Sequence, residues 1–492
     1  MVRDVVLGFD VGTTSVKAGL LFLGDDGPPE TVTHGYLTTR PAPGRVEQDP
    51  DAWLTSMRAC WLELTDRVGS LRVHAIGLCS QVNTHLLVDA SLQPTYPAIN
   101  WQDTRAVAEA AELDARVAGQ REAFWGGPFR IDASYALARL AWLARHEPIA
   151  FEAARWLMSP KDYCVAAICG EVVSDTISPV GLVGPDDHYI GAALDLVEGA
   201  AAMLPPLRAF DALAGTTRAD NAVGLPEGIP VSVGTMDAWS SVFGSGLVHV
   251  GRAMEVAGTS EVLAIVSDRA VPTPGIISFA PVHGLQLHAG PTQAGGSALD
   301  WAAALLGRTR AELLDLAAVA LADPQPILFL PHLAGERAPH WNPDARGVFM
   351  GLTAATEPHH LALAVLEGVA FAARQVLDRC QQAAGLPATQ LRLSGGAARS
   401  RTWNQVKASV HGRIISVLET LDSGVLGAAL VGLVAAGIEP DLEGATERRV
   451  KVDHEVEPDM GAQPRLDDLF GIYREAYPAL EPVFARLSVV QR

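Results

Sequence analysis

The stretch Gly8–Gly19, GFDVGTTSVKAG, decides the fold, and it directly follows a short apolar run, Val5–Leu7. Its pattern predicts a strand, a tight polar turn and a second strand, because glycine in the turn permits unusual backbone angles. Asp10, at the end of the first strand, is a candidate magnesium ligand acting through water. An ordinary Gly-Thr hairpin is the alternative that this stretch alone leaves open. The groups that could form a phosphate cradle are Gly12, Thr13, Thr14, Ser15 and Lys17.

A second copy of this pattern appears at Met254–Ala264, MEVAGTSEVLA. Gly258 and Thr259 again lie in a turn between two apolar, strand-like runs. Recurrence predicts two related halves, each with one phosphate-binding hairpin. The two hairpins would face each other across a cleft and hold one nucleoside triphosphate.

With this pair of hairpins, the chain resembles the FGGY carbohydrate kinases, which belong to the superfamily of actin and hexokinase. The resemblance implies an α/β fold of two related domains of the actin-like (ribonuclease H-like) ATPase type. Each domain would be a mixed five-stranded sheet flanked by helices, with an interdomain cleft. We predict an N-terminal domain over 1–246, a C-terminal domain over 247–445, and a C-terminal loop and helix over 446–492 that the sequence assigns to neither domain.

Composition agrees with a two-domain enzyme, since 492 residues are too many for one core. A net charge of −19 argues against nucleic acid or an anionic membrane as a partner. The five cysteines are odd in number and form no CxxC pair, so neither a disulfide framework nor a zinc site is indicated. Asp10 and Gly12 interrupt the first apolar run too early for a signal peptide, so we expect a cytoplasmic enzyme.

Polar residues lie between two apolar strands at Val73–Cys79 and His85–Asp89. In the kinases that the chain resembles, the equivalent loop contacts the sugar, and in xylulokinases its usual form is Ser-Gly-Gln-Met-His-Gly. Gln81 is retained here, but Val82 and Asn83 stand where Met and His would be. We predict that all three bind substrate; a plain polar turn is the alternative.

The segment Ile99–Arg105 is similar to the family's Trp-x-Asp-x-Arg segment, which lines the sugar pocket. The resemblance implies that Trp101 and Asp103 contact substrate. A core position is the alternative for Trp101. Asp103 would also serve as the N-cap of the following helix.

An acidic residue, Asp237, follows the short apolar strand Ile229–Val233, and small residues come after it. In an open α/β sheet, ligands bind outside the carboxyl ends of the strands. The family's catalytic base occupies this place, so the resemblance implies that Asp237 is both the base and a substrate contact. A helix N-cap is the alternative role.

Glycines also mark an adenosine site in the second half. Gly295 and Gly296 precede a helix, where a backbone can approach a nucleotide closely. Leu391–Gly396, LRLSGG, resembles the adenosine-binding motif, in which Asn404 would bond the adenine. The candidate nucleotide contacts of this half are Gly258, Thr259, Gly296, Gly395, Gly396, Ala397 and Asn404.

Several further elements are predicted from caps and periodicity. Asp49 and Pro50 begin a helix. Four other segments are a turn at Asp25–Gly27, a structural helix within Ser159–Glu171, a surface loop over 438–463 and a helix over 467–487. Val425–Ile438 is too short for a membrane span of about 20 residues and is predicted as a buried helix.

We therefore expect an ATP- and Mg²⁺-dependent kinase, a phosphotransferase with an alcohol group as acceptor. Xylulose-like pentuloses lead the candidate substrates, with gluconate, glycerol, another ketose or another polyol still open. A non-catalytic nucleotide-driven clamp of the actin type is a rival, and Asp237 and the Trp101 segment weigh against it. A degenerate kinase kept for sugar sensing is a third reading. The oligomeric state stays open, with a homodimer among the alternatives.

Overall fold

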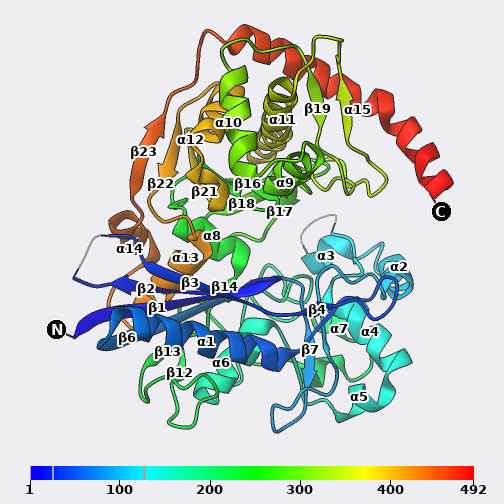
Figure 1. The fold of residues 1–492 in the computed structure, drawn as a ribbon. Coiled ribbons are helices and arrows are strands. Elements are labelled where there is room, and N and C mark those ends of the chain that lie inside the picture. Colours follow the sequence, from blue (N-terminus) through cyan, green and yellow to red (C-terminus); the bar gives the residue numbers. More distant parts are fainter. Residues whose placement is uncertain (1, 25–26, 126–128, 492) are drawn as a thin grey trace. The chain divides into compact units, whose positions relative to one another are not determined.

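The computed structural model describes residues 2–24, 27–125 and 129–491. Asp25 and Asp26 of the predicted Asp25–Gly27 turn lie outside the described residues. Packing divides the chain into two compact units (Figure 1): unit 1 contains Met1–Gly244 and Ser423–Arg449, and unit 2 contains Ser245–Asp422 and Val450–Arg492. These units differ from the predicted ranges because 423–445 belong to unit 1. The C-terminal helix, which the sequence assigned to neither domain, belongs to unit 2.

The sheet of unit 1 has the order β12-β13-β6-β1-β2-β3, with β14 beside β6. β1 pairs antiparallel with β2 and parallel with β6. The strands are β1 (Arg3–Val11), β2 (Ser15–Phe22), β3 (Glu30–Gly35), β6 (Leu71–Ser80), β12 (Leu213–Thr216), β13 (Pro230–Ser232) and β14 (Thr235–Met236).

The sheet of unit 2 has the order β17-β18-β16-β15-β21-β22-β23. β15 pairs antiparallel with β16 and parallel with β21, which repeats the pattern of β1, β2 and β6 and confirms the predicted internal duplication. The strands are β15 (Arg252–Ala257), β16 (Glu261–Ser267), β17 (Ile277–Ser278), β18 (Gln286–Pro291), β21 (Gln390–Ser394), β22 (Ile415–Leu418) and β23 (Val452–Val456).

Within the described residues, the main sheet of each unit has seven strands, where five were predicted. The five expected strands are present in each unit, as β13-β6-β1-β2-β3 and β22-β21-β15-β16-β18. The additional strands β12, β14, β17 and β23 are short, and three of them lie at sheet edges.

Side chains along β1 alternate between the two faces of the sheet, and each face packs against a different layer of helices. Val5, Leu7 and Phe9 are fully buried in the core cluster that includes Trp53 and Met57 of α1 (Pro50–Val68). Successive side chains of a strand point to opposite faces, so the even-numbered positions face the other layer. The predicted cap is confirmed, since the Asp49 side chain accepts from the Asp51 N–H at the start of α1.

Helix α13 (Ser423–Ala435) covers that other face through contacts between glycine and backbone. A Cβ at Gly77 would lie 1.7 Å from the Ala428 carbonyl oxygen, and one at Gly427 would lie 1.8 Å from the Ser240 carbonyl oxygen. α13 therefore packs directly on β6 and on α8 (Asp237–Gly244), which begins at the candidate base. This confirms the helix predicted at Val425–Ile438 and brings a late segment of the chain into unit 1.

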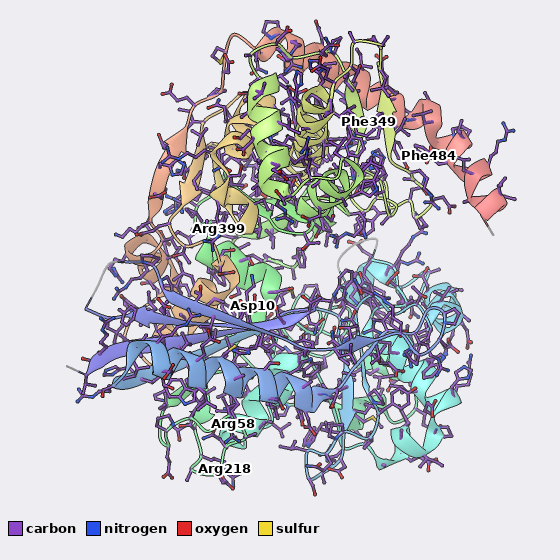
Figure 2. All side chains as sticks on the ribbon, in the orientation of Figure 1. Asp10, Arg58, Arg218, Phe349, Arg399 and Phe484 are labelled. Atoms are coloured by element: carbon purple, nitrogen blue, oxygen red, sulfur yellow. The ribbon has the colours of Figure 1, made fainter. Side chains whose placement is uncertain are left out.

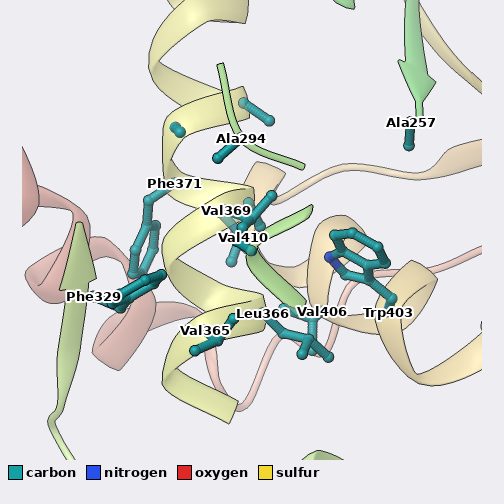
Figure 3. Packing of buried hydrophobic residues seen from close by; sticks show 14 of the residues in the cluster. Ala257, Ala294, Phe329, Val365, Leu366, Val369, Phe371, Trp403, Val406 and Val410 are labelled. Carbon is teal, nitrogen blue, oxygen red and sulfur yellow. The ribbon is translucent and has the colours of Figure 1, made fainter. Parts of the chain in front are cut away.

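The core of unit 2 is built around the long helix α11 (Pro358–Ala384) (Figure 3). Val365, Val369 and Phe371 pack in this cluster with Phe329 of β19 (Leu328–Leu330). Among the described residues, α11 is the one helix long and apolar enough to cross a membrane, but 83% of its apolar window is buried inside the protein. Its apolar character is thus explained by its place in the core.

The region 438–463 is not the loop that we predicted, because it contains α14 and β23. The predicted last helix is confirmed as α15, which starts earlier than expected.

The remaining elements of unit 1 are β4 (Thr38–Thr39), β5 (Glu47–Gln48), β7 (Leu86–Val88), β8 (Ala98–Ile99), α2 (Val107–Arg116), α3 (Arg121–Trp125), α4 (Ala136–His146), α5 (Pro148–Ala153), β9 (Trp156–Met158), α6 (Pro160–Cys169), β10 (Ser174–Asp175), α7 (Gly191–Leu194), η1 (Ala200–Met203), β11 (Leu207–Arg208) and α14 (Leu442–Arg449). Those of unit 2 are α9 (Gly296–Leu305), α10 (Arg310–Ala320), β20 (Val348–Met350), η2 (Gly396–Arg399), α12 (Arg401–His411) and α15 (Gln463–Gln491).

Candidate functional site

The turn between β1 and β2 directs its carbonyl groups into unit 1. The Tyr36 hydroxyl donates to the Gly12 carbonyl, the Gln48 amide donates to the Thr13 carbonyl at 2.8 Å, and the Tyr36 N–H donates to the Thr14 carbonyl at 3.1 Å. In a trans peptide the N–H of the next residue points opposite to the carbonyl. The N–H groups of Thr13, Thr14 and Ser15 therefore point away from those partners, as a phosphate-binding turn requires. Lys17 follows on β2, where it pairs in register with Asp10.

The predicted sugar loop follows β6, and Gln81 within it is buried. Its amide nitrogen donates to Gln48 at 2.8 Å and to the Tyr36 hydroxyl at 3.4 Å, so both hydrogens are used within the protein. Val82 and Asn83 are partly exposed, and Asn83 adopts a left-handed backbone with φ 56°. Asn83 and Val82 thus stay available to a ligand, whereas Gln81 has no donor left for one.

Trp101 joins the second predicted sugar segment to the phosphate hairpin. Its indole N–H donates to the Thr13 hydroxyl at 2.9 Å, and its backbone N–H donates to the Thr84 hydroxyl at 3.2 Å. The ring is partly exposed, so this residue is not a core tryptophan.

The carboxylate of Asp103 is hydrogen-bonded within the protein, and it does not cap a helix. One carboxylate oxygen accepts from the Arg105 backbone and guanidinium at 2.9 Å, and the other accepts from the Val46 N–H at 2.5 Å. The predicted N-cap role is wrong, because α2 begins later, with Ala106 at its N-cap position. Asp103 is 2% exposed, so the structure shows it shaping the loop from within.

A buried arginine, Arg139 on α4, supports both sugar segments. It donates to the carbonyl groups of Asn83, Ile99 (2.9 Å) and Asn100 (2.6 Å). Burial lowers the pKa of this guanidinium to about 9. Sequence reasoning missed Arg139, because no motif surrounds it and its partners are backbone groups far away in the chain.

Asp10 and Asp237 form a pair of carboxylates at the ends of neighbouring elements of unit 1. Asp10 is the last residue but one of β1 (Figure 2) and lies on the face that α13 covers, since a Cβ at Gly424 would lie 2.8 Å from its Oδ2. Asp237 begins α8 and accepts hydrogen bonds from the N–H groups of Ala238 and Val82. Burial, followed by the charge of Asp10, raises the pKa of Asp237 to about 7. The candidate base therefore touches the predicted sugar loop and responds to the candidate metal ligand.

A cavity of about 30 Å³ lies against the sugar loop, lined by Ser80–His85, Asp162, Tyr189 and Met236 among others. Ligand pockets usually measure roughly 300–1,000 Å³, so this cavity suits one or two water molecules and no sugar. The buried ion pair of Lys161 with Asp162 and Asp175 borders this region and supports the structural role predicted for α6.

The turn between β15 and β16 in unit 2 rests on the N-terminus of α9. The Gly258 carbonyl accepts from the Gly296 N–H at 2.8 Å, and the Thr259 carbonyl accepts from the Gly295 N–H at 3.0 Å. By the same peptide geometry, the N–H groups of Thr259 and Ser260 point away from α9. A Cβ at Gly296 would lie 2.9 Å from the Gly258 carbonyl oxygen, so in this structure Gly296 serves the close packing of the hairpin.

The glycines after β21 have different surroundings. Gly395 has φ 89°, and a Cβ there would lie 2.4 Å from the Ala257 carbonyl oxygen. Gly396 is exposed, and a Cβ there would meet nothing within 4 Å, so it offers bare backbone to a ligand. Ala397 is buried, and Asn404 is 1% exposed with its amide donating to the Ala398 carbonyl at 2.7 Å. Asn404 thus holds the turn η2 in shape.

Four buried ionisable residues connect α12 to the second hairpin. Lys407 contacts Glu255 and lies 2.6 Å from Glu261, and His411 lies 3.1 Å from Glu255. Each is at most 7% exposed. The sequence pattern did not reveal this cluster, although Glu261 directly follows the Gly-Thr-Ser turn.

The candidate metal site has few protein ligands. No group of three or more His, Cys, Asp or Glu side chains that could hold a metal ion occurs within 2–24, 27–125 and 129–491. Mg²⁺ commonly takes one or two carboxylates and completes its shell with water and substrate phosphates. A site with Asp10 as its protein carboxylate is compatible with that ion.

Two units of one mixed α/β topology, each with a phosphate-type hairpin between its first strands, define a nucleotide-binding protein of the actin-like fold class. Comparison with family models is more specific: the N-terminal domain of the FGGY family of carbohydrate kinases matches residues 5–244, and its C-terminal domain matches 253–436. The chain belongs to this family of carbohydrate kinases, and it is a phosphotransferase with an alcohol group as acceptor.

Individual relatives extend over nearly the whole chain. The chain is 32% identical over 489 residues to the xylulose kinase of Escherichia coli (strain K12), covering 96% of this chain and 99% of that protein. It is 26% identical to the gluconokinase of Bacillus subtilis (strain 168), covering 91% and 92%. A crystal structure described as a xyloylose kinase from Brucella ovis aligns with a TM-score of 0.84 and 30% identity, covering 97% of this chain and all of that one.

Proposed function

We propose that this protein transfers the γ-phosphate of ATP to a hydroxyl group of a xylulose-like pentulose. The observation that carries the proposal is Asp237, a partly buried carboxylate that accepts from the Val82 N–H of the sugar loop and lies near Asp10. The full-length similarity to xylulose kinases supports the pentulose as the first candidate.

In the proposed reaction, a sugar oxygen forms a bond to the γ-phosphorus while the bond from that phosphorus to the β,γ-bridging oxygen breaks. Asp237 accepts the proton of the sugar hydroxyl. Phosphoryl transfer of this kind depends mostly on positioning and on neutralisation of charge. General-base assistance of this type contributes about 100- to 10,000-fold.

The phosphate groups would be held by backbone N–H groups of the two hairpins. In unit 1 these belong to Thr13, Thr14 and Ser15, with Lys17 on the following strand. In unit 2 they belong to the Gly258–Ser260 turn, and Gly396 offers open backbone to the adenosine. Mg²⁺, bound mainly by the phosphates and water, would neutralise charge on them, and Asp10 would help to place it.

The identity of the substrate depends on the exposed part of the sugar loop. Asn83 and Trp101 are both partly exposed, and the Asn83 side-chain oxygen has no partner among the described residues, whereas the Trp101 N–H is donated to Thr13 and only its ring is open to a ligand. The donors of Gln81 and the oxygens of Asp103 are used internally. We propose that Asn83 and Trp101 contact the sugar directly and that Gln81 and Asp103 support them. Gluconate is the second candidate substrate, because a gluconokinase is among the relatives.

A screen of ADP release against ketoses, aldonates and polyols tests this proposal. We expect xylulose, or a closely related pentulose, to give the highest sugar-dependent rate, and gluconate the second. Equal ADP release with and without every sugar would instead favour a non-catalytic nucleotide-binding protein.

We further propose that the enzyme acts in the cytoplasm and needs neither nucleic acid nor a membrane. The net charge of −19 supports this part, because binding to polyanions requires concentrated positive charge. A homodimer is the proposed alternative to a monomer, and size-exclusion chromatography with light scattering decides between them.

A further inference from the structure

A chain of buried side-chain amides connects the sugar loop to the phosphate hairpin in unit 1. The Asn100 amide donates to the Gln81 carbonyl oxygen at 2.9 Å, and the Gln81 amide donates to the Gln48 carbonyl oxygen at 2.8 Å. The Gln48 amide then donates to the backbone carbonyl of Thr13 at 2.8 Å. Asn100, Gln81 and Gln48 are each at most 1% exposed.

Backbone groups at both ends of this series of amides determine which side-chain atom of each amide donates and which accepts. At one end, the Gln102 N–H donates to the Asn100 side-chain oxygen at 2.9 Å, and an N–H can only donate. At the other end, the Thr13 carbonyl can only accept. Reversing any one amide would place nitrogen against nitrogen and oxygen against oxygen, so only one arrangement satisfies all the bonds.

Gln48 is the amide of this series that contacts the phosphate hairpin. It lies on β5, the middle strand of a small sheet whose outer strands are β4 and β8. β8 runs directly into Asn100 and Trp101 of the sugar segment. A second link runs parallel to the amides, since the Trp101 indole donates to the Thr13 hydroxyl.

The peptide that Gln48 contacts is the one that presents the Thr14 N–H to the phosphate side. Because the Thr13 carbonyl and the Thr14 N–H belong to one planar unit, orienting the carbonyl orients the N–H as well. The linked amides therefore fix the position of a phosphate-binding N–H group relative to the sugar loop.

We propose that Gln48 is a positioning residue for phosphoryl transfer. It holds the phosphate hairpin at a fixed position relative to the bound sugar and contacts neither the nucleotide nor the sugar. This inference rests on the proposed kinase function. Misplacement of reacting groups by about 1 Å can cost on the order of 100-fold in rate. A poorly registered phosphate would also be lost more often to water.

The test uses the full chain with Gln48→Met, which keeps similar volume and removes the amide. We expect nucleotide and sugar affinities, measured calorimetrically, to stay within about threefold, while turnover falls about 10- to 100-fold. The ratio of ADP formed to sugar phosphate formed should rise above that of the parent, because water competes better for the misplaced phosphate.

Gln286→Met is the matched control. The Gln286 amide also donates to a backbone carbonyl, that of Phe279, at 2.9 Å. It lies in unit 2 and pairs in register with Ser267, at the end of β16 opposite the Gly258–Ser260 turn. Turnover and product ratio should equal those of the parent. Gln48→Asn provides a milder variant should Gln48→Met fail to fold: its amide is one methylene too short to reach both partners, and it should also raise the product ratio.

An unchanged product ratio and turnover in folded Gln48→Met or Gln48→Asn protein would overturn the positioning role. A loss of thermal stability with parental turnover per folded molecule would do so too, since it indicates a purely structural amide. If the parent itself phosphorylates no sugar, the proposed function fails first, and the ADP screen shows that before any variant is made.

Discussion

At the scale of single residues, the proposed reaction depends most on Asp237. Asp237→Asn keeps the size and hydrogen bonding of the side chain but removes the negative charge. Sugar and ATP should still bind, while turnover falls about 100- to 10,000-fold, the usual contribution of a general base. Steady-state kinetics with calorimetric binding measures both quantities.

Asp49→Asn is the matched control, because asparagine caps a helix about as well as aspartate. Its turnover should remain parental. If well-folded Asp237→Asn kept turnover within a few-fold of the parent, Asp237 would be only a helix-terminal residue and the base would have to be sought elsewhere.

The raised pKa of Asp237 also predicts a pH-dependent stability difference. Its folded-state pKa of about 7 lies above the ordinary value of 3.8, so the folded protein binds this proton more tightly than the unfolded chain. That stabilisation is complete below about pH 4 and is lost as the pH rises through 7. Asp237→Asn loses nothing over this range.

Urea unfolding of metal- and nucleotide-free protein between pH 4 and pH 8 measures this effect. The variant should gain on the order of 1–3 kcal/mol relative to the parent from the lower to the higher pH, since one pKa unit corresponds to about 1.4 kcal/mol and the site is partly exposed. A constant difference across this range would mean that burial and Asp10 do not raise this pKa.

Sequence could locate residues that belong to a contiguous motif, such as the two hairpins and Asp237. It could not separate ligand contacts from internal support, because that depends on partners distant in the chain. Gln48 lies 33 positions from Gln81 and 35 from Thr13, so no local spacing reveals their hydrogen bonds. The internal role of Asp103 is hidden for the same reason, since one of its oxygens accepts from the N–H of Val46, 57 positions earlier.

At the scale of elements, the packing of α13 leaves the least room for a larger side chain. Gly427→Ala would place a methyl group 1.8 Å from the Ser240 carbonyl oxygen, and neither backbone can rotate away. Overpacking typically costs about 1–3 kcal/mol, and we expect the upper end of that range. Thermal and urea unfolding measure the loss.

Gly471→Ala in α15 serves as the control, because a Cβ there meets nothing within 4 Å and alanine favours a helix over glycine. It should be neutral or slightly stabilising. Equal stability of both variants would show that α13 does not pack directly on α8.

Elements with strong periodicity were predicted well, whereas short or exposed ones were not. α14 buries only Leu442, Ala445 and Thr446, and β23 is exposed along most of its length, so neither gives an amphipathic signal. Two of the extra sheet strands, β14 and β17, have only two residues each, too few for alternation to be visible.

At the scale of the whole molecule, we propose that unit 1 supplies the sugar site and one phosphate hairpin, and that unit 2 supplies the adenosine site and the other phosphate hairpin. Asn83→Ala in unit 1 should raise the KM for sugar at least several-fold and leave that for ATP nearly unchanged, because a site built on hydrogen bonds discriminates strongly when one is lost. Gly396→Val in unit 2 should do the reverse, since its side chain would fill open space beside the backbone.

Gly395→Val is the informative contrast, because its side chain would collide with the Ala257 carbonyl and strain a residue at φ 89°. It should destabilise unit 2, whereas Gly396→Val should fold normally. Parallel changes in both KM values for either Asn83→Ala or Gly396→Val would contradict the division of roles.

The central claim is phosphate transfer to a pentulose hydroxyl, and direct identification of the product tests it most closely. Parent protein, ATP, Mg²⁺ and xylulose are incubated, and phosphorus NMR with mass spectrometry follows the products. We expect a pentulose monophosphate to accumulate in step with ADP, and its formation to require ATP, Mg²⁺ and xylulose together. ADP and inorganic phosphate without any sugar phosphate, from xylulose or from the other ketoses, aldonates and polyols, would contradict it.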